Sequence, residues 1–279
     1  MSNLPTAFLF PGQGAQVVGM GKDLYDAHPV ARECFEAASE AIGTSLEKLC
    51  FEGPAEELTL TENAQPAILT ASVAAWRVFT QSYDASAVAV AMAGHSLGEY
   101  SALVAAGAVS LEDAARIVRA RGTAMQKAVP AGRGKMAAIM GLEPEKVLAI
   151  CEASAGDEVV APANHNAPTQ IVIAGSAAAV ERACQAAVAE GGKAIPLEVS
   201  APFHCSLMQP AAEELKPVLA QATFTESKIP VIRNVDAAPH GSADEIREKL
   251  YEQVTSPVRW VDTVMKLQQL GAKRFVEVG

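Results

Sequence analysis

The stretch AMAGHSLGEY, residues 91–100, constrains the fold more than any other part of the chain. Its apolar beginning predicts the end of a buried strand, and helix-forming residues follow Gly98. Gly94 and Gly98 flank Ser96, which favours a tight turn that holds the serine hydroxyl clear of the backbone. A plain helix cap formed by Ser96 and Glu99 would explain the serine. It would not explain the two glycines or the preceding strand. We therefore predict a strand, a turn and a helix in direct succession.

The first and last parts of the chain alternate strands and helices. We predict strands at 7–10, 88–93, 230–234 and 274–278, and helices at 29–42, 46–51, 64–82, 111–128, 206–221, 244–254 and 258–270. This alternation favours a parallel sheet covered by helices. The last strand needs neighbours, so we expect it to return to the sheet that begins near residue 7.

The segment between these parts has a different order of elements. Its predicted strands are 136–140, 159–163, 170–174 and 193–199, with helices at 144–154 and 177–190. The resulting β-α-β-β-α-β order is that of a ferredoxin-like module. Glycine-rich residues before it and Ser200-Ala201-Pro202 after it fit the ends of an inserted domain. We therefore predict an α/β protein with a discontinuous domain, 1–131 plus 201–279, and a small domain, 132–200.

Composition excludes several classes of protein. The 279 residues are 50% apolar and 19% charged, and the net charge of −10 argues against a nucleic-acid surface. The longest apolar stretch, 85–94, is about half a membrane span. Five widely spaced cysteines without a CxxC pair favour neither a disulfide framework nor a zinc site. We expect a cytoplasmic protein with buried reduced thiols, no metal and no membrane contact.

A serine hydroxyl is a weak nucleophile at neutral pH and needs a base. His204 lies where the chain re-enters the large domain, so it can face the cleft between domains, where ligand sites concentrate. His165, expected between two strands of the small domain, remains an alternative. The other histidines are expected on the surface or pointing away from Ser96: His28, His95 and His240.

The sequence leaves open which residue orients this base. A hydrolase triad would place an acidic residue between the serine and the histidine in the sequence. Asp113, Asp157 and Glu198 are available there, but none lies in a recognisable turn.

One arginine lies on a face that helical periodicity predicts to be buried. In the helix predicted at 111–128, Arg121 shares the i, i+3, i+4, i+7 stripe with alanine, isoleucine, valine and methionine. A buried guanidinium is costly unless an anion pairs with it. Its partner is either an acidic residue of the protein or a substrate carboxylate held by a bidentate pair.

The segment Pro11-Gly12-Gln13-Gly14 follows the first strand. It is not a dinucleotide fingerprint, because Val17 stands where a third glycine would be needed, and no GKS or GKT follows. We predict no bound cofactor. A turn at this edge of the sheet can offer a backbone N–H to an oxyanion beside the serine.

Taken together, the motifs resemble one family in order along nearly the whole chain. They are FPGQGAQ at 10–16, GHSLGE at 94–99, RARG at 119–122, NHN at 164–166, PFH at 202–204 and YEQV at 251–254. This set resembles the malonyl-CoA:acyl carrier protein transacylase family. The resemblance implies an α/β-hydrolase-like large domain with an inserted ferredoxin-like domain. Members continue past residues 275–279 into further helices.

The resemblance also implies a role for each matching residue. Ser96 would be the nucleophile, His204 the base, and Arg121 the partner of the malonyl carboxylate. The backbone amides of Gln13 and Leu97 would form the oxyanion hole.

The remaining matches concern the substrate and the histidine. Gln253 would help to orient His204 through its backbone carbonyl, in place of the missing acid. Phe203 resembles the malonyl-selective form of this motif, and Asn164 is placed among the substrate-binding residues. The implied partners are malonyl-CoA and acyl carrier protein, bound by a monomer.

Alternatives remain open on the same architecture. A serine esterase or thioesterase would release free acid without a carrier thiol, and a docking subunit would bind carriers without chemistry. The pathway is fatty-acid or polyketide synthesis. Because carrier proteins are acidic, Arg133 and Lys135 are candidates for carrier or CoA phosphates, although an ordinary solvated turn explains them equally well.

Overall fold

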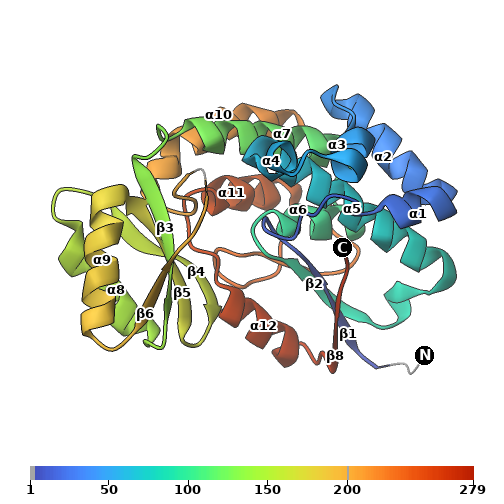
Figure 1. Cartoon of the computed structure of the whole chain (residues 1–279). Helices are drawn as coiled ribbons and strands as arrows, with labels where there is room; N and C mark the ends of the chain where they lie inside the picture. Colours follow the sequence, from blue (N-terminus) through green and yellow to red (C-terminus); the bar gives the residue numbers. More distant parts are fainter. Residues whose placement is uncertain (1–3, 200) are drawn as a thin grey trace.

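The computed structural model describes residues 4–199 and 201–279, and the chain forms a mixed α/β fold with two four-stranded sheets (Figure 1). Ser200, at the predicted boundary of the small domain, and residues 1–3 lie outside the described residues. The first sheet is entirely parallel, and the second is antiparallel. Figure 1 shows the two sheets at opposite ends of the molecule.

The parallel sheet brings together segments that are far apart in the chain. It consists of β1 (Thr6–Phe10), β2 (Ala89–Gly94), β7 (Val231–Ile232) and β8 (Arg274–Glu277), in the order β7-β2-β1-β8. The last strand pairs with β1, with Phe275 opposite Ala7. This confirms the expected return of the chain to its first sheet.

Side-chain alternation along β1 determines what covers each face of this sheet. Phe8 and Phe10 point into the larger hydrophobic core with α5 (Thr61–Ser82). Ala7 faces the opposite side, where it packs with Leu267 of α12 (Trp260–Gln269). Small residues on one face and aromatic residues on the other therefore let helices cover both sides of the sheet.

The antiparallel sheet has the order β4-β5-β3-β6. Its strands are β3 (Gly134–Met140), β4 (Val160–Ala167), β5 (Gln170–Ser176) and β6 (Lys193–Pro196), and its helices are α8 (Pro144–Ala155) and α9 (Ala177–Ala189). Ile139 and Ile173 face these helices in a separate hydrophobic cluster. Met136 and Val172 face the opposite way and join the larger core.

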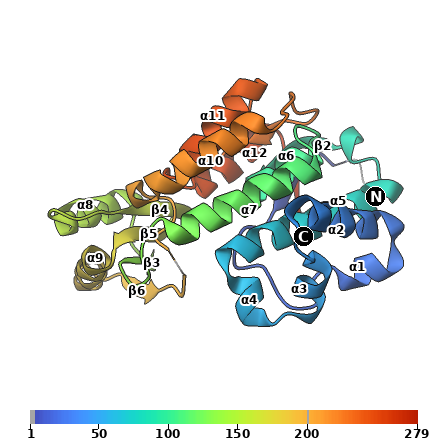
Figure 2. The same ribbon diagram turned by 90° about the horizontal axis from the view of Figure 1, so that it is seen from above.

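The remaining helices lie around the parallel sheet and between the two sheets. They are α1 (Lys22–Ala27), α2 (Pro29–Ile42), α3 (Leu46–Glu52), α4 (Ala55–Thr59), α6 (Gly98–Ala105), α7 (Leu111–Lys127), α10 (Gln209–Gln221) and α11 (Ala243–Gln253), with short 3₁₀ turns at Ala85–Ala87 and Ser206–Met208. Figure 2 shows α7 and α10 running side by side from the parallel sheet toward the antiparallel one. Of the residues described, none belongs to a helix long and apolar enough to cross a membrane.

Several strands differ in extent from the sequence prediction, among them β7, which covers only Val231–Ile232 of the predicted 230–234. β4 continues to Ala167, so residues 164–166 lie within a strand rather than between strands. Irregular pairing near Pro162 and near His165 explains why the alternating pattern was hidden there. β6 ends at Pro196 instead of residue 199, although the N–H of Leu197 still donates to the carbonyl of Met136 at 3.0 Å.

The turn between β2 and α6 depends on the absence of side chains at two glycines. A Cβ at Gly94 would lie 1.9 Å from the backbone carbonyl of Gly98, and a Cβ at Gly98 would lie 2.2 Å from the carbonyl oxygen of Phe10. The strand and the helix therefore touch backbone to backbone.

We expect Gly94→Ala to lower the free energy of unfolding by about 3 kcal/mol or more, because backbone atoms cannot move aside as a flexible side chain can. Chemical denaturation measures the effect. Gly191→Ala is the matched control, since its Cβ meets open space at φ +86° and costs only the left-handed backbone, about 1–2 kcal/mol. Equal losses in the two variants would contradict this account of the turn.

Candidate active site

Ser96 occupies the turn between β2 and α6 in a strained backbone conformation. Its φ is 52°, a region that non-glycine residues rarely adopt. The Ser96 N–H donates a 2.6 Å hydrogen bond to Oδ1 of Asn234, whose Nδ2 donates to the carbonyl of Gly94 at 2.8 Å. Asn234 therefore holds both sides of the turn. This geometry confirms the predicted strand, turn and helix and leaves the serine hydroxyl in a cavity.

His204 is the histidine that the structure brings to Ser96. Its Nε2 lies 2.7 Å from the serine Oγ. Its Nδ1 lies 3.0 Å from the carbonyl oxygen of Gln253 and 3.1 Å from that of Ser256. A carbonyl can only accept, so Nδ1 carries the proton and Nε2 is free to accept one from the serine hydroxyl.

Among the described residues no carboxylate orients the histidine, and two backbone carbonyls take the place of the acid that the sequence left open. Asp113 instead binds Arg116 and the N–H of Thr223. Asp157 is exposed, and Glu198 lines the cavity without a hydrogen bond to the imidazole in the described part of the chain.

Burial and the nearby charge of Arg121 keep His204 neutral. Desolvation is the largest cause, with Arg121 and His95 adding to it, and together they lower the pKa of His204 to about 3. The two carbonyl acceptors oppose this shift. A neutral imidazole at physiological pH is the form that can act as a general base.

Arg121 is buried, with 1% of its surface exposed, and lies beside the serine. Nη2 donates to Ser96 Oγ and to Oε1 of Gln253, each at 3.0 Å, and Nη1 donates to Oε1 of Gln65 at 3.0 Å. The guanidinium also lies over the ring of Tyr100, 5.6 Å from its centroid. Within the described residues it forms no ion pair, so neutral groups are all that it directly contacts.

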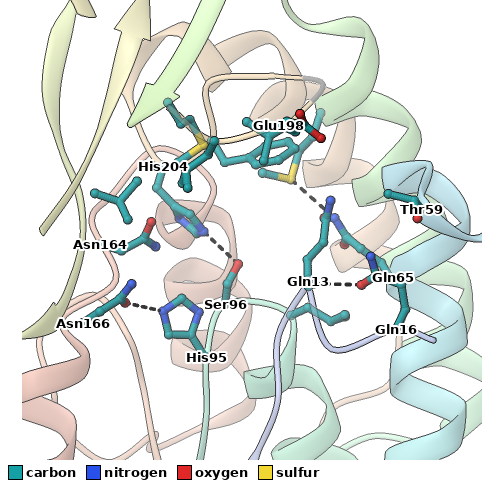
Figure 3. Close-up of a pocket in the computed structure, with 18 of the residues that line it drawn as sticks. Gln13, Gln16, Thr59, Gln65, His95, Ser96, Asn164, Asn166, Glu198 and His204 are labelled. Atoms are coloured by element: carbon teal, nitrogen blue, oxygen red, sulfur yellow. Dashed lines mark hydrogen bonds between the residues drawn. The ribbon is translucent and has the colours of Figure 1, made fainter. Parts of the chain in front are cut away.

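Figure 3 shows the serine hydroxyl joined to the histidine by a hydrogen bond. Both side chains line a cavity of about 260 Å³. Parallel-sheet loops and α4, α5 and α7 form one side, and the antiparallel sheet with the segment after β6 forms the other. The lining includes Gln65, Met125, Met136, Val172, Leu197 and Phe203. A mostly apolar wall with a few polar groups is typical of a small-molecule site.

Two backbone amides at the cavity are free to stabilise negative charge. The N–H groups of Gln13 and Leu97 donate to no protein acceptor within the described residues. Leu97 directly precedes α6, so its amide belongs to the positive end of that helix. Gln13 lies in the loop after β1. The side-chain Nε2 of Gln13 donates to Thr61 Oγ1 at 3.2 Å.

The three remaining predicted residues lie around the same centre in different ways. Asn164 and Phe203 are buried and line the cavity, with the Asn164 amide near His204 in Figure 3. Gln253 is completely buried and contacts the protein: its side chain binds Arg121, Glu99 and the carbonyl of Ser96.

The other histidines were placed less well from the sequence. His240 was expected on the surface, but it is buried and its Nε2 lies 2.7 Å from Glu99 Oε1. The bridge between Ile232 and Pro239 folds its loop back against the sheet, which explains this error.

His95 and His165 have surroundings of their own. His95 lines the cavity and pairs with Asn166 Oδ1 at 2.8 Å, rather than with Ser96. His165 is half-buried in β4, and the structure brings it to another hollow. Burial lowers the pKa of both histidines.

Sequence reasoning missed three residues that hold the centre together: Gln65, Glu99 and Asn234. The sequence indicates Glu99 as a possible helix cap and as the last residue of the GHSLGE motif, but its place next to the glycine turn also made its burial foreseeable. Asn234 follows a strand at the same sheet edge as Ser96, which is the one signal that could have singled it out.

The two basic residues proposed for phosphates are both exposed. Lys135 forms an ion pair with Glu181, whereas Arg133 has no ion pair within the described residues. In the same part of the chain, no group of three or more His, Cys, Asp or Glu side chains could hold a metal ion.

Comparison with known proteins agrees with this geometry. Residues 7–279 match the family model described as the acyl transferase domain. The malonyl CoA-acyl carrier protein transacylase of Bacillus subtilis is 50% identical over 275 residues, which cover 98% of this chain and 86% of the relative.

Solved structures give the same result. An acyl carrier protein S-malonyltransferase from Vibrio cholerae has a TM-score of 0.95 and 46% identity, covering 99% of this chain and 90% of that one. A malonyl-transacylase in complex with a type II polyketide acyl-carrier protein has a TM-score of 0.94 and 45% identity, covering 98% and 88%. The family resemblance is thereby confirmed, and the chain belongs to the acyl transferase family that includes the malonyl CoA-acyl carrier protein transacylases.

Proposed function

We propose that the protein transfers a malonyl group from malonyl-CoA to the phosphopantetheine thiol of an acyl carrier protein, through an acyl-enzyme on Ser96. One observation carries the choice of acyl group: a buried guanidinium, Arg121, lies 3.0 Å from the serine Oγ and has no carboxylate partner among the described residues. The names of the relatives support the same reaction. The carrier complex of one neighbour supports the partner.

In the first step the Ser96 Oγ attacks the thioester carbonyl carbon while its proton passes to Nε2 of His204. The C–S bond then breaks, and the departing CoA sulfur takes the proton from the imidazolium. In the second step the carrier thiol gives its proton to the imidazole and attacks the malonyl ester. The Ser96 oxygen leaves and recovers the proton.

In each step the free amides of Gln13 and Leu97 stabilise the negative charge that develops on the carbonyl oxygen. Each such donor stabilises the transition state by about 3 kcal/mol. These groups are fixed by the loop after β1 and by the start of α6, so they need no reorganisation during the reaction.

Arg121 links the binding of substrate to the activation of the base. Its positive charge lowers the pKa of His204. A malonyl carboxylate paired with the guanidinium would offset this charge, so the histidine becomes a better base when a dicarboxylic acyl donor is present. The same pairing draws the guanidinium away from the serine oxygen, which frees an electron pair for attack.

The other site residues shape and hold this arrangement. Phe203 and Asn164 form the wall against the malonyl group, and Gln253 positions Arg121 and His204. Two carbonyls in place of a carboxylate make His204 a milder base toward water, which favours transfer over hydrolysis.

We also propose the domain division 1–131 plus 201–279 for an α/β-hydrolase-like catalytic domain and 132–200 for a ferredoxin-like one. Two observations support this division: the two sheets are separate, and the ferredoxin-like domain has a hydrophobic cluster of its own. We propose a cytoplasmic monomer, which the five free cysteines fit. The proposed pathway is fatty-acid biosynthesis, with polyketide synthesis as the alternative suggested by the carrier of one neighbour.

We expect intact-mass spectrometry after mixing with malonyl-CoA to show one added malonyl group, and Ser96→Ala to abolish it. Ser101→Ala is the matched control, because this buried serine of α6 should leave the adduct unchanged. Labelling that persists in Ser96→Ala would reject the nucleophile. Free malonate released without a carrier thiol would indicate a thioesterase.

We expect Arg121→Ala to reduce kcat/KM for malonyl-CoA by about 2–5 kcal/mol in transition-state free energy and to raise the relative activity with acetyl-CoA. The change removes one side of a desolvated charge pair. Arg116→Ala, at an exposed arginine of the same helix, should change neither quantity. An unchanged preference between the two acyl donors would mean that Arg121 serves only the fold.

The pH profile of acylation offers a further check. Because the pKa of His204 is lowered to about 3, the imidazole stays neutral between pH 8 and pH 5. Single-turnover acylation, measured by rapid quenching, should therefore show no histidine titration near pH 6.5. The sign follows from the base being active only when neutral, so protonation reduces the rate only below the ordinary titration range of histidine. A decline centred near pH 6.5 would contradict the assignment.

A further inference from the structure

Glu99 is a buried carboxylate that the proposed reaction does not use. It is 0% exposed and lies on α6, three residues after the serine. It accepts hydrogen bonds from the N–H of Asn234 at 2.8 Å, from Nε2 of Gln253 at 2.9 Å and from Nε2 of His240 at 2.7 Å. Such a set of donors holds a carboxylate in place with its negative charge kept inside the protein.

A single side-chain amide separates this anion from the buried cation of the site. Gln253 donates through Nε2 to Glu99 Oε2 and accepts through Oε1 from Arg121 Nη2 at 3.0 Å. The amide dipole is therefore aligned, with its positive end on the carboxylate and its negative end on the guanidinium. The negative charge of Glu99 favours the charged form of the arginine, because it opposes the lowering of the pKa of Arg121 by burial.

We propose that Glu99 is the counter-charge of Arg121 in the empty site, and that it acts through the Gln253 amide as a positioning residue for malonyl selection. The inference rests on the function proposed above. A direct ion pair would occupy the guanidinium and exclude a substrate carboxylate, whereas a carboxylate one amide away compensates the buried cation and leaves its donors available.

The arrangement also limits how tightly a substrate carboxylate binds. Glu99 repels a second carboxylate at Arg121, so part of the attraction is offset before the acyl group is transferred. Binding energy that is equal in ground state and transition state does not raise turnover, and a moderate affinity lets the malonyl group leave with the carrier.

Glu99→Gln tests the charge with little change of shape. The new amide oxygen can accept from Asn234 and Gln253, and the new NH₂ can donate to His240 Nε2, because the unbonded Nδ1 of that histidine can take the ring proton. Loss of the repelling charge should tighten the binding of free malonate by roughly tenfold, measured by calorimetry. The uncharged probe malonamide should show no such gain.

Glu245→Gln is the matched control. Glu245 forms a direct ion pair with Arg233, away from the cavity, so its loss should leave malonate affinity unchanged. Glu99→Asp keeps the charge and should bind malonate as the unmodified protein does. Unchanged or weaker malonate binding by Glu99→Gln would overturn the proposal.

A double-mutant cycle on folding keeps the test decisive if Glu99→Gln is unstable. Glu99→Gln should lower the melting temperature by several degrees in the unmodified chain and by clearly less in Arg121→Met, because no buried cation then needs compensation. Equal losses in both backgrounds, or failure of both variants to fold, would reject the coupling. The proposed function stands or falls separately, by whether the unmodified protein forms the malonyl-enzyme.

Discussion

A guanidinium buried among neutral partners is the constraint on which the active site depends. Arg121 gives its hydrogen bonds to two glutamine carbonyls and to the serine hydroxyl. Burying a cation is costly in free energy, and the surrounding residues are arranged to offset that cost without consuming the charge. A carboxylate that enters the cavity completes an ion pair that the folded chain leaves incomplete. The selectivity that we propose for a dicarboxylic acyl group rests on this deficit.

Gln253 connects several parts of the site. Its backbone carbonyl fixes the tautomer of His204, and its side chain contacts Arg121, Glu99 and the carbonyl of Ser96. One residue thus joins the base, the substrate-binding cation and the serine turn. This explains why a histidine without an acidic partner is still held in one orientation.

Among the described residues, three non-glycine residues have a positive φ, and two of them, Ser96 and His204, are the pair that we propose exchanges the proton. Both Ser96 and His204 have a left-handed backbone, with φ values of 52° and 59°. Such conformations persist only where the surroundings enforce them. At Ser96 the enforcing contacts are Asn234 and the close approach of β2 to α6, and at His204 they are the carbonyl acceptors.

Local pattern alone determined much of this protein. Glycines at fixed spacing around Ser96 fixed a strand, a turn and a helix, because only glycine permits that backbone approach. Helical periodicity placed Arg121 on a buried face, and the order of elements from 134 to 200 predicted the antiparallel sheet. Family resemblance then supplied the roles of the remaining matches.

Tertiary structure decided what depends on distant partners. The second carbonyl that replaces an acid and the partners of the histidines arise from contacts between distant segments. His204 and Gln253 are 49 positions apart, and His240 and Glu99 are 141 positions apart. Asn234 and Glu99 meet across 135 positions. No local pattern encodes such pairings. They form only when a sheet brings the ends of strands from distant parts of the chain to one edge.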